Sequence, residues 1–294
     1  MRFLYNPFLL YIFIFLLGWP MFNSCAQIGS TEQQNGPTDS RFPYDLSAPK
    51  IDLLPRVLEE ISGITFHPKF PGLLFAIEDE TGNLYAYDLE NSKIAWTVTF
   101  GKNGDYEEVT TDGDSFYVLR SDGSIFSFGL DTNRRIYGLK HHNKLLPAGE
   151  YEALAFSPAE QKLIAVCKVC KVDRKEKRTT GYKIDILPDD QLRLASSFSI
   201  DMDDLQRLDR SMAKTFKPSA IAYRQLTREW YVLSSIDRAI VVLDSTFTPK
   251  HIARFKRKDY KQPEGITFDS TGHLYISSEG GDITDGKLYK FNLK

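Results

Sequence analysis

The segment Gln262-Pro-Glu-Gly-Ile-Thr-Phe268 decides the fold, because four other segments of the chain repeat its pattern. These are Glu60-Ile-Ser-Gly-Ile-Thr-Phe66, Asp105-Tyr-Glu-Glu-Val-Thr-Thr111, Glu150-Tyr-Glu-Ala-Leu-Ala-Phe156 and Lys217-Pro-Ser-Ala-Ile-Ala-Tyr223. Successive copies are 45, 45, 67 and 45 residues apart, so the long interval is the same unit with an insertion. A fixed period of this length is typical of a propeller or a solenoid.

Each copy continues through a turn into further short apolar strands. The predicted second strands are Leu73–Ile77, Ser115–Leu119, Lys162–Val166, Glu229–Leu233 and His273–Ser277. A third strand such as Asn83–Leu89 follows, and most copies then show a fourth, such as Lys93–Phe100. Four strands per period, with Gly, Asp and Pro at the turns, predict the blade of an all-β propeller.

The repeats predict five four-stranded blades. The last copy ends after three strands, and Lys50–Leu54 is expected to supply its fourth strand, which leaves no sheet edge unpaired at the seam. Six blades are possible if the insertion at Lys171–Lys214 forms a blade of its own. Within that insertion, Asp203–Lys214 is expected to form a short helix.

The N-terminus has the form of an export signal. Ten apolar residues, Phe8–Leu17, follow Arg2 and precede Pro20, a run too short to span a membrane as a helix. Phe22-Asn-Ser-Cys25 then resembles the lipobox of bacterial lipoproteins. We therefore expect a signal peptide at residues 1–24, a tether at 25–41 starting from a lipidated Cys25, and the propeller domain at 42–294. Simple secretion without a lipid is the alternative.

The charge balance argues against one class of partner. The chain has 37 Lys and Arg against 39 Asp and Glu, a formal charge of -2, whereas nucleic-acid-binding proteins usually show a basic excess. The membrane, reached through the lipid anchor, is the expected partner. The expected location is the cell envelope, facing the periplasm or the exterior.

Two further cysteines stand in Cys167-Lys-Val-Cys170. One such pair supplies only two zinc ligands, and no second pair completes a site. Positions i and i+3 of a regular strand also point to opposite faces. We expect one buried cysteine and one at a strand end, either free or bridged across a turn.

Equivalent residues of the innermost strands should form rings around the propeller axis. The third-position ring contains Ser62, Glu107, Glu152, Ser219 and Glu264. Three converging carboxylates raise one another's pKa unless a cation neutralises them. Ca²⁺ held by Glu107, Glu152 and Glu264 is one candidate cation, because it prefers oxygen ligands.

Side chains at the ends of the second strands are also expected near this ring. Arg120 and Lys168 could balance the glutamates internally, while Asp79 and Glu279 would add further carboxylates. Two interpretations follow. Either the channel mouth binds a cation or a polar ligand through these residues, or the glutamates accept hydrogen bonds from neighbouring blades and serve only the structure.

Other charged segments carry weaker signals. His141-His142 lacks helical zinc spacing and is expected in a solvated polar loop. The basic stretches Lys171–Arg178 and Lys250–Lys261 fit solvated surface, with contact to anionic lipid as an alternative. The sequence contains no G-x-S-x-G nucleophile elbow.

Taken together, the repeats resemble the SdiA-regulated protein family. The resemblance rests on Tyr106-Glu-Glu-Val-Thr110 with Tyr117–Gly123, on Tyr231-Val-Leu-Ser-Ser235, and on Pro263-Glu-Gly-Ile-Thr267 with Tyr275–Glu279. It implies an envelope β-propeller, similar in style to the NHL-repeat and gluconolactonase-like propellers. The latter hold a divalent cation at the channel through a glutamate, and Glu264 matches that style of motif.

Three functional hypotheses follow from these observations. The first is a binding module that displays a channel-mouth site to a small ligand or an envelope protein. The alternative is a metal-dependent hydrolase of lactones or esters, with Ca²⁺ as Lewis acid and Glu107, Glu152 or Glu264 as ligand or base. The third is a structural scaffold of the envelope.

Overall fold

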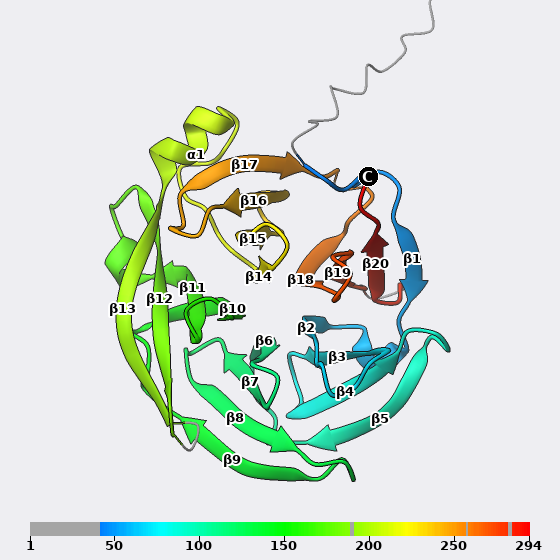
Figure 1. The fold of residues 1–294 in the computed structure, drawn as a ribbon. Coiled ribbons are helices and arrows are strands. Elements are labelled where there is room, and N and C mark those ends of the chain that lie inside the picture. The colour runs from blue at the N-terminus through cyan, green and yellow to red at the C-terminus, as the bar shows by residue number, and fades with distance from the viewer. Residues whose placement is uncertain (1–41, 189–190, 257, 282–283) are drawn as a thin grey trace, which may run out of the picture. The chain divides into compact units, whose positions relative to one another are not determined.

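The computed structural model describes residues 42–188, 191–256, 258–281 and 284–294, so the predicted signal peptide and tether lie outside the described residues. Those ranges form five four-stranded antiparallel sheets arranged in a ring (Figure 1). The chain is therefore a five-bladed β-propeller, which confirms the fold predicted from the repeats.

In blades 1 to 4 the strands follow one another outward from the axis in chain order, whereas the outermost strand of blade 5 is β1. Blade 1 contains β2 (Ile61–Phe66), β3 (Leu73–Glu78), β4 (Asn83–Asp88) and β5 (Lys93–Thr99). Blade 2 contains β6 (Tyr106–Thr111), β7 (Ser115–Arg120), β8 (Ile125–Leu130) and β9 (Ile136–His142). Blade 3 contains β10 (Gly149–Ser157), β11 (Lys162–Cys170), β12 (Arg178–Leu187) and β13 (Gln191–Asp201). Blade 4 contains β14 (Ala220–Arg224), β15 (Glu229–Ser234), β16 (Ala239–Leu243) and β17 (Pro249–Arg254). Blade 5 contains β18 (Gln262–Phe268), β19 (Leu274–Glu279), β20 (Lys287–Phe291) and β1 (Lys50–Leu53).

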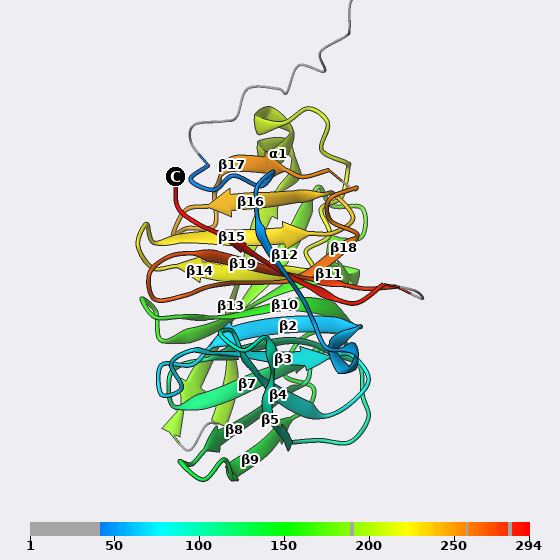
Figure 2. The same cartoon turned by 90° about the vertical axis from the view of Figure 1, so that its right-hand side faces the viewer.

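The five repeated openings lie at the centre of the ring. Their strands β2, β6, β10, β14 and β18 each contact the next, and β18 contacts β2, so the inner circle is closed. Viewed from the side, the C-terminus after β20 lies on one face of the propeller and the loop between β19 and β20 on the other (Figure 2). All five inner strands start at the second face. We call the channel end on that face, which carries Ser62, Glu107, Glu152, Ser219 and Glu264, the acidic mouth.

The two ends of the domain meet in one blade. β1 pairs antiparallel with β20, from Lys50 opposite Lys290 to Leu53 opposite Lys287. The buried Tyr44 reinforces the seam, because its hydroxyl donates to the Gly272 carbonyl over 2.6 Å and accepts from Arg224 Nε over 2.9 Å. The predicted closing strand is confirmed, and the hydrogen-bonded seam removes two free sheet edges.

The insertion extends blade 3 and does not form a sixth blade. β12 and β13 are 10 and 11 residues long, and helix α1 (Met202–Leu208) follows them. The helix is shorter than predicted. Asp209 adopts an extended backbone and its side chain accepts the Ser211 amide, a local alternative to helical hydrogen bonding. Within the described ranges, no helix is long and apolar enough to cross a membrane.

The core is divided among the blade interfaces. Five clusters of buried apolar side chains each join two adjacent blades; the one between blades 1 and 2 contains Phe75, Phe116 and Phe128. Alternating apolar side chains on both faces of each sheet build these layers. The layers hold the inner strands in fixed positions around the channel.

Candidate functional site

In four of the five inner strands, β2, β6, β10 and β18, a β-bulge lies at or beside the third residue of the repeat. In β6 the register passes from Tyr106 opposite Arg120 to Glu108 opposite Leu119, which leaves Glu107 as the extra residue. Glu152 in β10 and Glu264 in β18 are extra in the same way, and the register of β2 shifts between Ile61 and Ile64. A bulge redirects a side chain out of the regular alternation. Here it brings the three glutamates of the predicted ring to the acidic mouth.

The glutamates of the ring are close enough to perturb one another. The pKa of Glu107 is raised to about 9, first by burial and then by the charges of Glu152 and Asp105. Burial also raises the pKa of Glu264, against hydrogen bonds from Ser219 and Ser235 and the charge of Lys168. The mouth is therefore a place where negative charge is costly without a cation.

Two more carboxyl groups predicted from the second strands belong to this cluster. Burial raises the pKa of Glu279 to about 8, with contributions from the Glu264 and Asp79 charges. The pKa of Asp79 rises to about 6 through burial and the neighbouring Glu60 and Glu78. Asp79 and Glu279 thus extend the ring on the side of blades 1 and 5.

Lys168 provides a positive charge within the acidic mouth. Its ammonium group pairs with the Glu152 carboxylate and lies 3.8 Å from Glu150 Oε1, while the lysine side chain is 20% exposed. The pKa of Glu152 is raised to about 7, mainly by burial, and the hydrogen bond and charge of Lys168 limit that rise. The prediction that Lys168 neutralises a ring glutamate agrees with this contact.

Arg120 is placed elsewhere, and its predicted role is corrected here. Its ion-pair partner is Asp122, at 3.9 Å, and it lines a pocket of about 570 Å³ with Tyr106, Phe126 and His141. The reason is the strand register. Arg120 lies opposite Tyr106, and the equivalent residue of blade 3, opposite Tyr151, is Cys167. Lys168 is the residue after Cys167, so it does not occupy the position of Arg120. Arg120 therefore does not balance the ring as Lys168 does.

The paired histidines also differ from the prediction. They end strand β9 and do not lie in a loop. His141 stacks on Phe126 with ring centroids 4.0 Å apart, and His142 Nε2 lies 3.0 Å from Ser127 Oγ. Adjacent residues of a strand face opposite sides, which separates their contacts.

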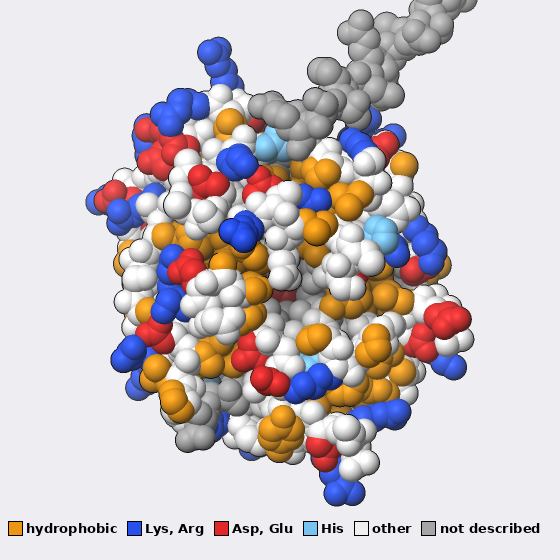
Figure 3. All heavy atoms as spheres, viewed as in Figure 1, with side chains coloured by type: hydrophobic (Ala, Val, Ile, Leu, Met, Phe, Trp, Pro, Cys, Tyr) orange, Lys and Arg blue, Asp and Glu red, His pale blue; other side chains and the backbone are white. Residues whose placement is uncertain are grey.

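The sequence prediction missed a buried carboxyl group in the inner strand β6. Glu108 is 1% exposed, its Oε2 has no hydrogen-bond partner among the described residues, and burial raises its pKa well above the usual range. It lines a cavity of about 140 Å³ in the channel together with Thr65, Thr110 and Thr267. Figure 3 shows the face opposite the acidic mouth, with a hollow at its centre. The signal was present: the other repeats have Gly or Ala at this position.

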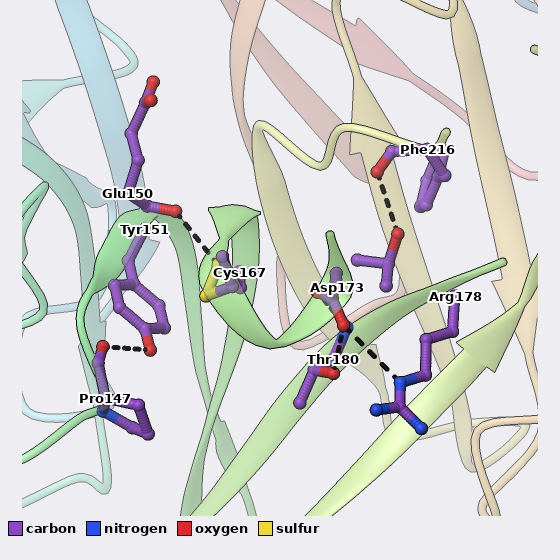
Figure 4. Close-up of a disulfide and its surroundings, with 10 residues drawn as sticks. Pro147, Glu150, Tyr151, Cys167, Asp173, Arg178, Thr180 and Phe216 are labelled. Carbon is purple, nitrogen blue, oxygen red and sulfur yellow. Dashed lines mark hydrogen bonds and ion pairs between the residues drawn. A yellow bond between two sulfur atoms is a disulfide. The ribbon is translucent and has the colours of Figure 1, made fainter. Parts of the chain in front are cut away.

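The cysteines form a disulfide, Cys167–Cys170, in strand β11 (Figure 4). Both are buried, at 1% and 4% exposure, and Cys170 is the last residue of β11, so the prediction of a buried cysteine and one at a strand end is confirmed, as is the bridged alternative. Only the predicted turn is wrong, because the bridge lies within the strand. The bridge spans a bulge inside the ladder of β10 and β11, with Lys168 as the extra residue.

Comparison with known proteins now identifies the lineage. The model of the SdiA-regulated family matches residues 42–281. The chain belongs to the SdiA-regulated family. No curated protein matches it.

Among solved structures, the chain is similar to glutaminyl cyclase from Myxococcus xanthus, with 14% identity and a TM-score of 0.57 over 83% of this chain and 94% of that one. It is also similar to a glucose dehydrogenase, with 12% identity and a TM-score of 0.50 over 84% and 100%. At these identities the likeness shows the propeller fold alone.

In this SdiA-regulated protein, two pockets of different charge flank the Lys168–Glu152 pair. One, of about 420 Å³, is lined by Asp105, Glu107, Asp122 and Glu150. The other, of about 400 Å³, is lined by Lys168, Arg238, Lys261 and Glu264. Among the described residues, no group of three or more His, Cys, Asp or Glu side chains is arranged to hold a metal ion. As the side chains stand, Lys168 is the cation that Glu152 contacts.

Proposed function

We propose that this protein is a binding module of the cell envelope whose acidic mouth takes a cationic group, with Ca²⁺ as the first candidate. Glu107, Glu152 and Glu264 would hold the cation, with Asp79 and Glu279 as outer carboxylates. The observation that carries the proposal is the bulge that recurs at the same repeat position and turns these three glutamates into one mouth. Bulges of this kind are frequent beside functional sites.

The donors are oxygen atoms of the kind that a hard cation prefers, and the described side chains would have to move closer together to hold one. Carboxylate oxygens surround the mouth, and the hydroxyl groups of Ser219 and Ser235 line the adjoining pocket. Glu152 Oε2 and Asp79 Oδ1 are buried and have no hydrogen-bond partner among the described residues. Buried polar atoms are usually satisfied, so these two oxygens are the first candidates to contact the proposed cation.

Lys168 sets a condition on that binding. Its ammonium group occupies the Glu152 carboxylate, so an incoming cation must displace it. Lys168 and the incoming cation therefore compete for Glu152. The observed affinity for the cation is lower than its intrinsic affinity by the free energy of the Lys168–Glu152 pair.

The test is calorimetric titration of the purified protein with Ca²⁺ at pH 8, with Mg²⁺ as the comparison ion, alongside a melting curve. We expect saturable heat and a raised melting temperature, since a ligand that binds only the folded state stabilises it. The Glu107→Gln/Glu264→Gln variant should bind roughly tenfold more weakly or not at all, because two charged ligands are lost. Absence of heat and of a thermal shift in the wild type would refute a Ca²⁺ site.

A hydrolase of lactones or esters is the second candidate. It is favoured by Glu152, whose pKa of about 7 suits a general base at neutral pH and which adjoins the pockets of the mouth. In that case Glu152, once released by Lys168, would accept a proton from the attacking water. Hydrolysis of simple lactones or aryl esters by the wild type, lost in a folded Glu152→Gln variant, would support this candidate. Absence of turnover above background in the wild type would refute it and leave the binding module as the proposed function.

The envelope location is part of the proposal and depends on the N-terminal segment. Cys25, in the lipobox-like Phe22-Asn-Ser-Cys25, would carry the lipid and the residues up to 41 would form the tether. Stable membrane anchoring takes two acyl chains, or one chain together with a basic patch. Cys25→Ser should release the protein into the soluble fraction. Equal membrane retention of both forms would contradict lipidation.

A further inference from the structure

Two bulges meet where strands β10 and β11 reach the acidic mouth. On β10 the extra residue is Glu152, and on β11 it is Lys168: Glu150 lies opposite Val169, Tyr151 opposite Cys167, and Ala153 opposite Val166. The oppositely charged side chains of the two extra residues contact each other. The pair at the mouth is thus made by the two residues that the regular ladder leaves out.

The disulfide closes around one of these bulges. In a regular strand, Cys167 and Cys170 would point to opposite faces, since three residues separate them. The extra residue Lys168 changes the alternation by one, so that both sulfurs reach the same face with their Cα atoms 5.9 Å apart. The bond can therefore form only while Lys168 remains in the bulge.

The surroundings of the disulfide are fixed. Gly149 lies opposite Cys170, and a Cβ at Gly149 would be 2.4 Å from Cys170 Sγ, so the sulfurs pack directly on the glycine. Tyr151 is fully buried beside them and its hydroxyl donates to the Pro147 carbonyl over 2.7 Å. Figure 4 shows Cys167, Glu150, Tyr151 and Pro147 together on this edge of blade 3.

We propose that the Cys167–Cys170 disulfide is a positioning device: it locks the bulge that holds the Lys168 ammonium group against Glu152, and thereby sets how strongly a cation must compete for the acidic mouth. The inference rests on the proposed function for its consequence, and on the geometry of β10 and β11 for the positioning itself. Lys168 is the specificity-determining residue, and the two cysteines act through it.

The direction of the effect follows from competition. Opening the disulfide releases the bulge, weakens the Lys168–Glu152 pair and makes Glu152 available, so the affinity for Ca²⁺ should rise. Loss of one partly buried ion pair corresponds to roughly a two- to fivefold change. Lys168→Met should raise the affinity at least as much, and opening the disulfide should then add nothing.

The experiment compares five forms of the full protein: oxidised wild type, wild type reduced with dithiothreitol, Cys167→Ser/Cys170→Ser, and Lys168→Met in the oxidised and in the reduced state. Dithiothreitol supplies two electrons and two protons to the disulfide and becomes its own cyclic disulfide, leaving two thiols. The first readout is the Ca²⁺ dissociation constant, and circular dichroism checks the fold of every form.

A second readout needs no ligand. Acetylation of lysines by a limiting amine-reactive ester, measured peptide by peptide, reports how well Lys168 is held, with the exposed Lys93 as the internal reference. We expect Lys168 to react roughly two- to fivefold faster relative to Lys93 once the disulfide is open. The serine variant covers the case in which the reductant does not reach the buried bond.

The outcomes separate the two proposals. Unchanged Lys168 reactivity in both the reduced and the serine forms overturns the positioning role. A redox effect on Ca²⁺ affinity that persists in Lys168→Met also overturns it, because the disulfide would then act through the fold. If no form binds Ca²⁺ but Lys168 becomes reactive, the proposed function fails while the positioning role is supported.

Discussion

Blades 2 and 3 place a glutamate at the same point of the repeat and surround it differently. Glu107 in blade 2 and Glu152 in blade 3 are both the extra residue of a bulge. Glu152 has the Lys168 ammonium group against it, whereas the arginine of blade 2, Arg120, pairs with Asp122 at the rim. The pKa of Glu107 consequently rises to about 9 and that of Glu152 only to about 7, although burial is the main cause in both.

The comparison separates what a repeat determines from what a single blade determines. The inner strand of the repeat sets where a carboxylate lies and in which direction it points. The second strand decides its charge environment, since one extra residue in β11 brings a lysine inward. A mouth built from one repeat position is therefore electrostatically asymmetric: Glu152 pairs with a lysine, whereas Glu107, Glu264 and Glu279 form no ion pair with a lysine or arginine among the described residues.

Removal of the neutralised glutamate should have the largest effect. Glu152→Gln leaves the partly buried Lys168 without its main counter-charge, and breaking such a pair from one side is destabilising. We expect a loss of about 1–3 kcal/mol in the free energy of unfolding at pH 8, measured by urea denaturation. Lys168→Met/Glu152→Gln should recover part of the loss. A neutral effect of Glu152→Gln would mean that the ion pair does not contribute to stability.

The glutamates without a lysine partner should make stability fall as the pH rises. The pKa values of Glu107 and Glu279 are raised from 4.5 to about 9 and about 8 in the folded protein. Such acids stabilise the fold fully below pH 4.5, and this contribution is lost as the pH rises through the folded pKa. We expect the wild type to lose roughly 1–3 kcal/mol between pH 6 and pH 9. Glu107→Gln should flatten the decline, and Ca²⁺ should oppose it.

The control for this pH dependence is Glu90→Gln, at an exposed loop position of blade 1. It should leave the slope unchanged, because Glu90 is exposed on the loop between β4 and β5 and lies outside the acidic mouth. An equal flattening by both variants would assign the slope to the overall charge of the protein and not to the acidic mouth.

The repeats alone were sufficient to predict the architecture. The spacing of the openings predicted the blades, and the unfinished last copy predicted the strand Lys50–Leu54, because both depend on hydrogen bonds between whole strands. The ring position of Glu107, Glu152 and Glu264 was also predictable, since equivalent residues of a propeller must share a radius. The repeat period and the pairing of whole strands involve many residues, so a bulge of one residue does not change them.

The charge partners could not be predicted, because they depend on single-residue shifts in register. Arg120 and Lys168 end corresponding strands, but only β11 contains the extra residue that turns its lysine inward. The same shift brought Cys167 and Cys170 to one face, contrary to regular strand alternation. Glu108 was overlooked because a glutamate next to another glutamate is usually expected on the solvated surface. In the structure, Glu108 is buried in the channel.

Arg120 should show the smallest effect and so provides the sharpest control for Lys168. Its contact with Asp122, at 3.9 Å between partly exposed groups, is worth at most about 0.5 kcal/mol. Arg120→Met should therefore leave the affinity of the acidic mouth for Ca²⁺ within about twofold of wild type, while Lys168→Met raises it. Both variants remove one positive charge, so a change in net charge alone would affect them equally. If the two variants change the affinity by the same factor, the long-range field of the protein controls the mouth, and the contact between Lys168 and Glu152 does not. If only Lys168→Met changes it, the single extra residue in β11 is what makes blade 3 different from blade 2.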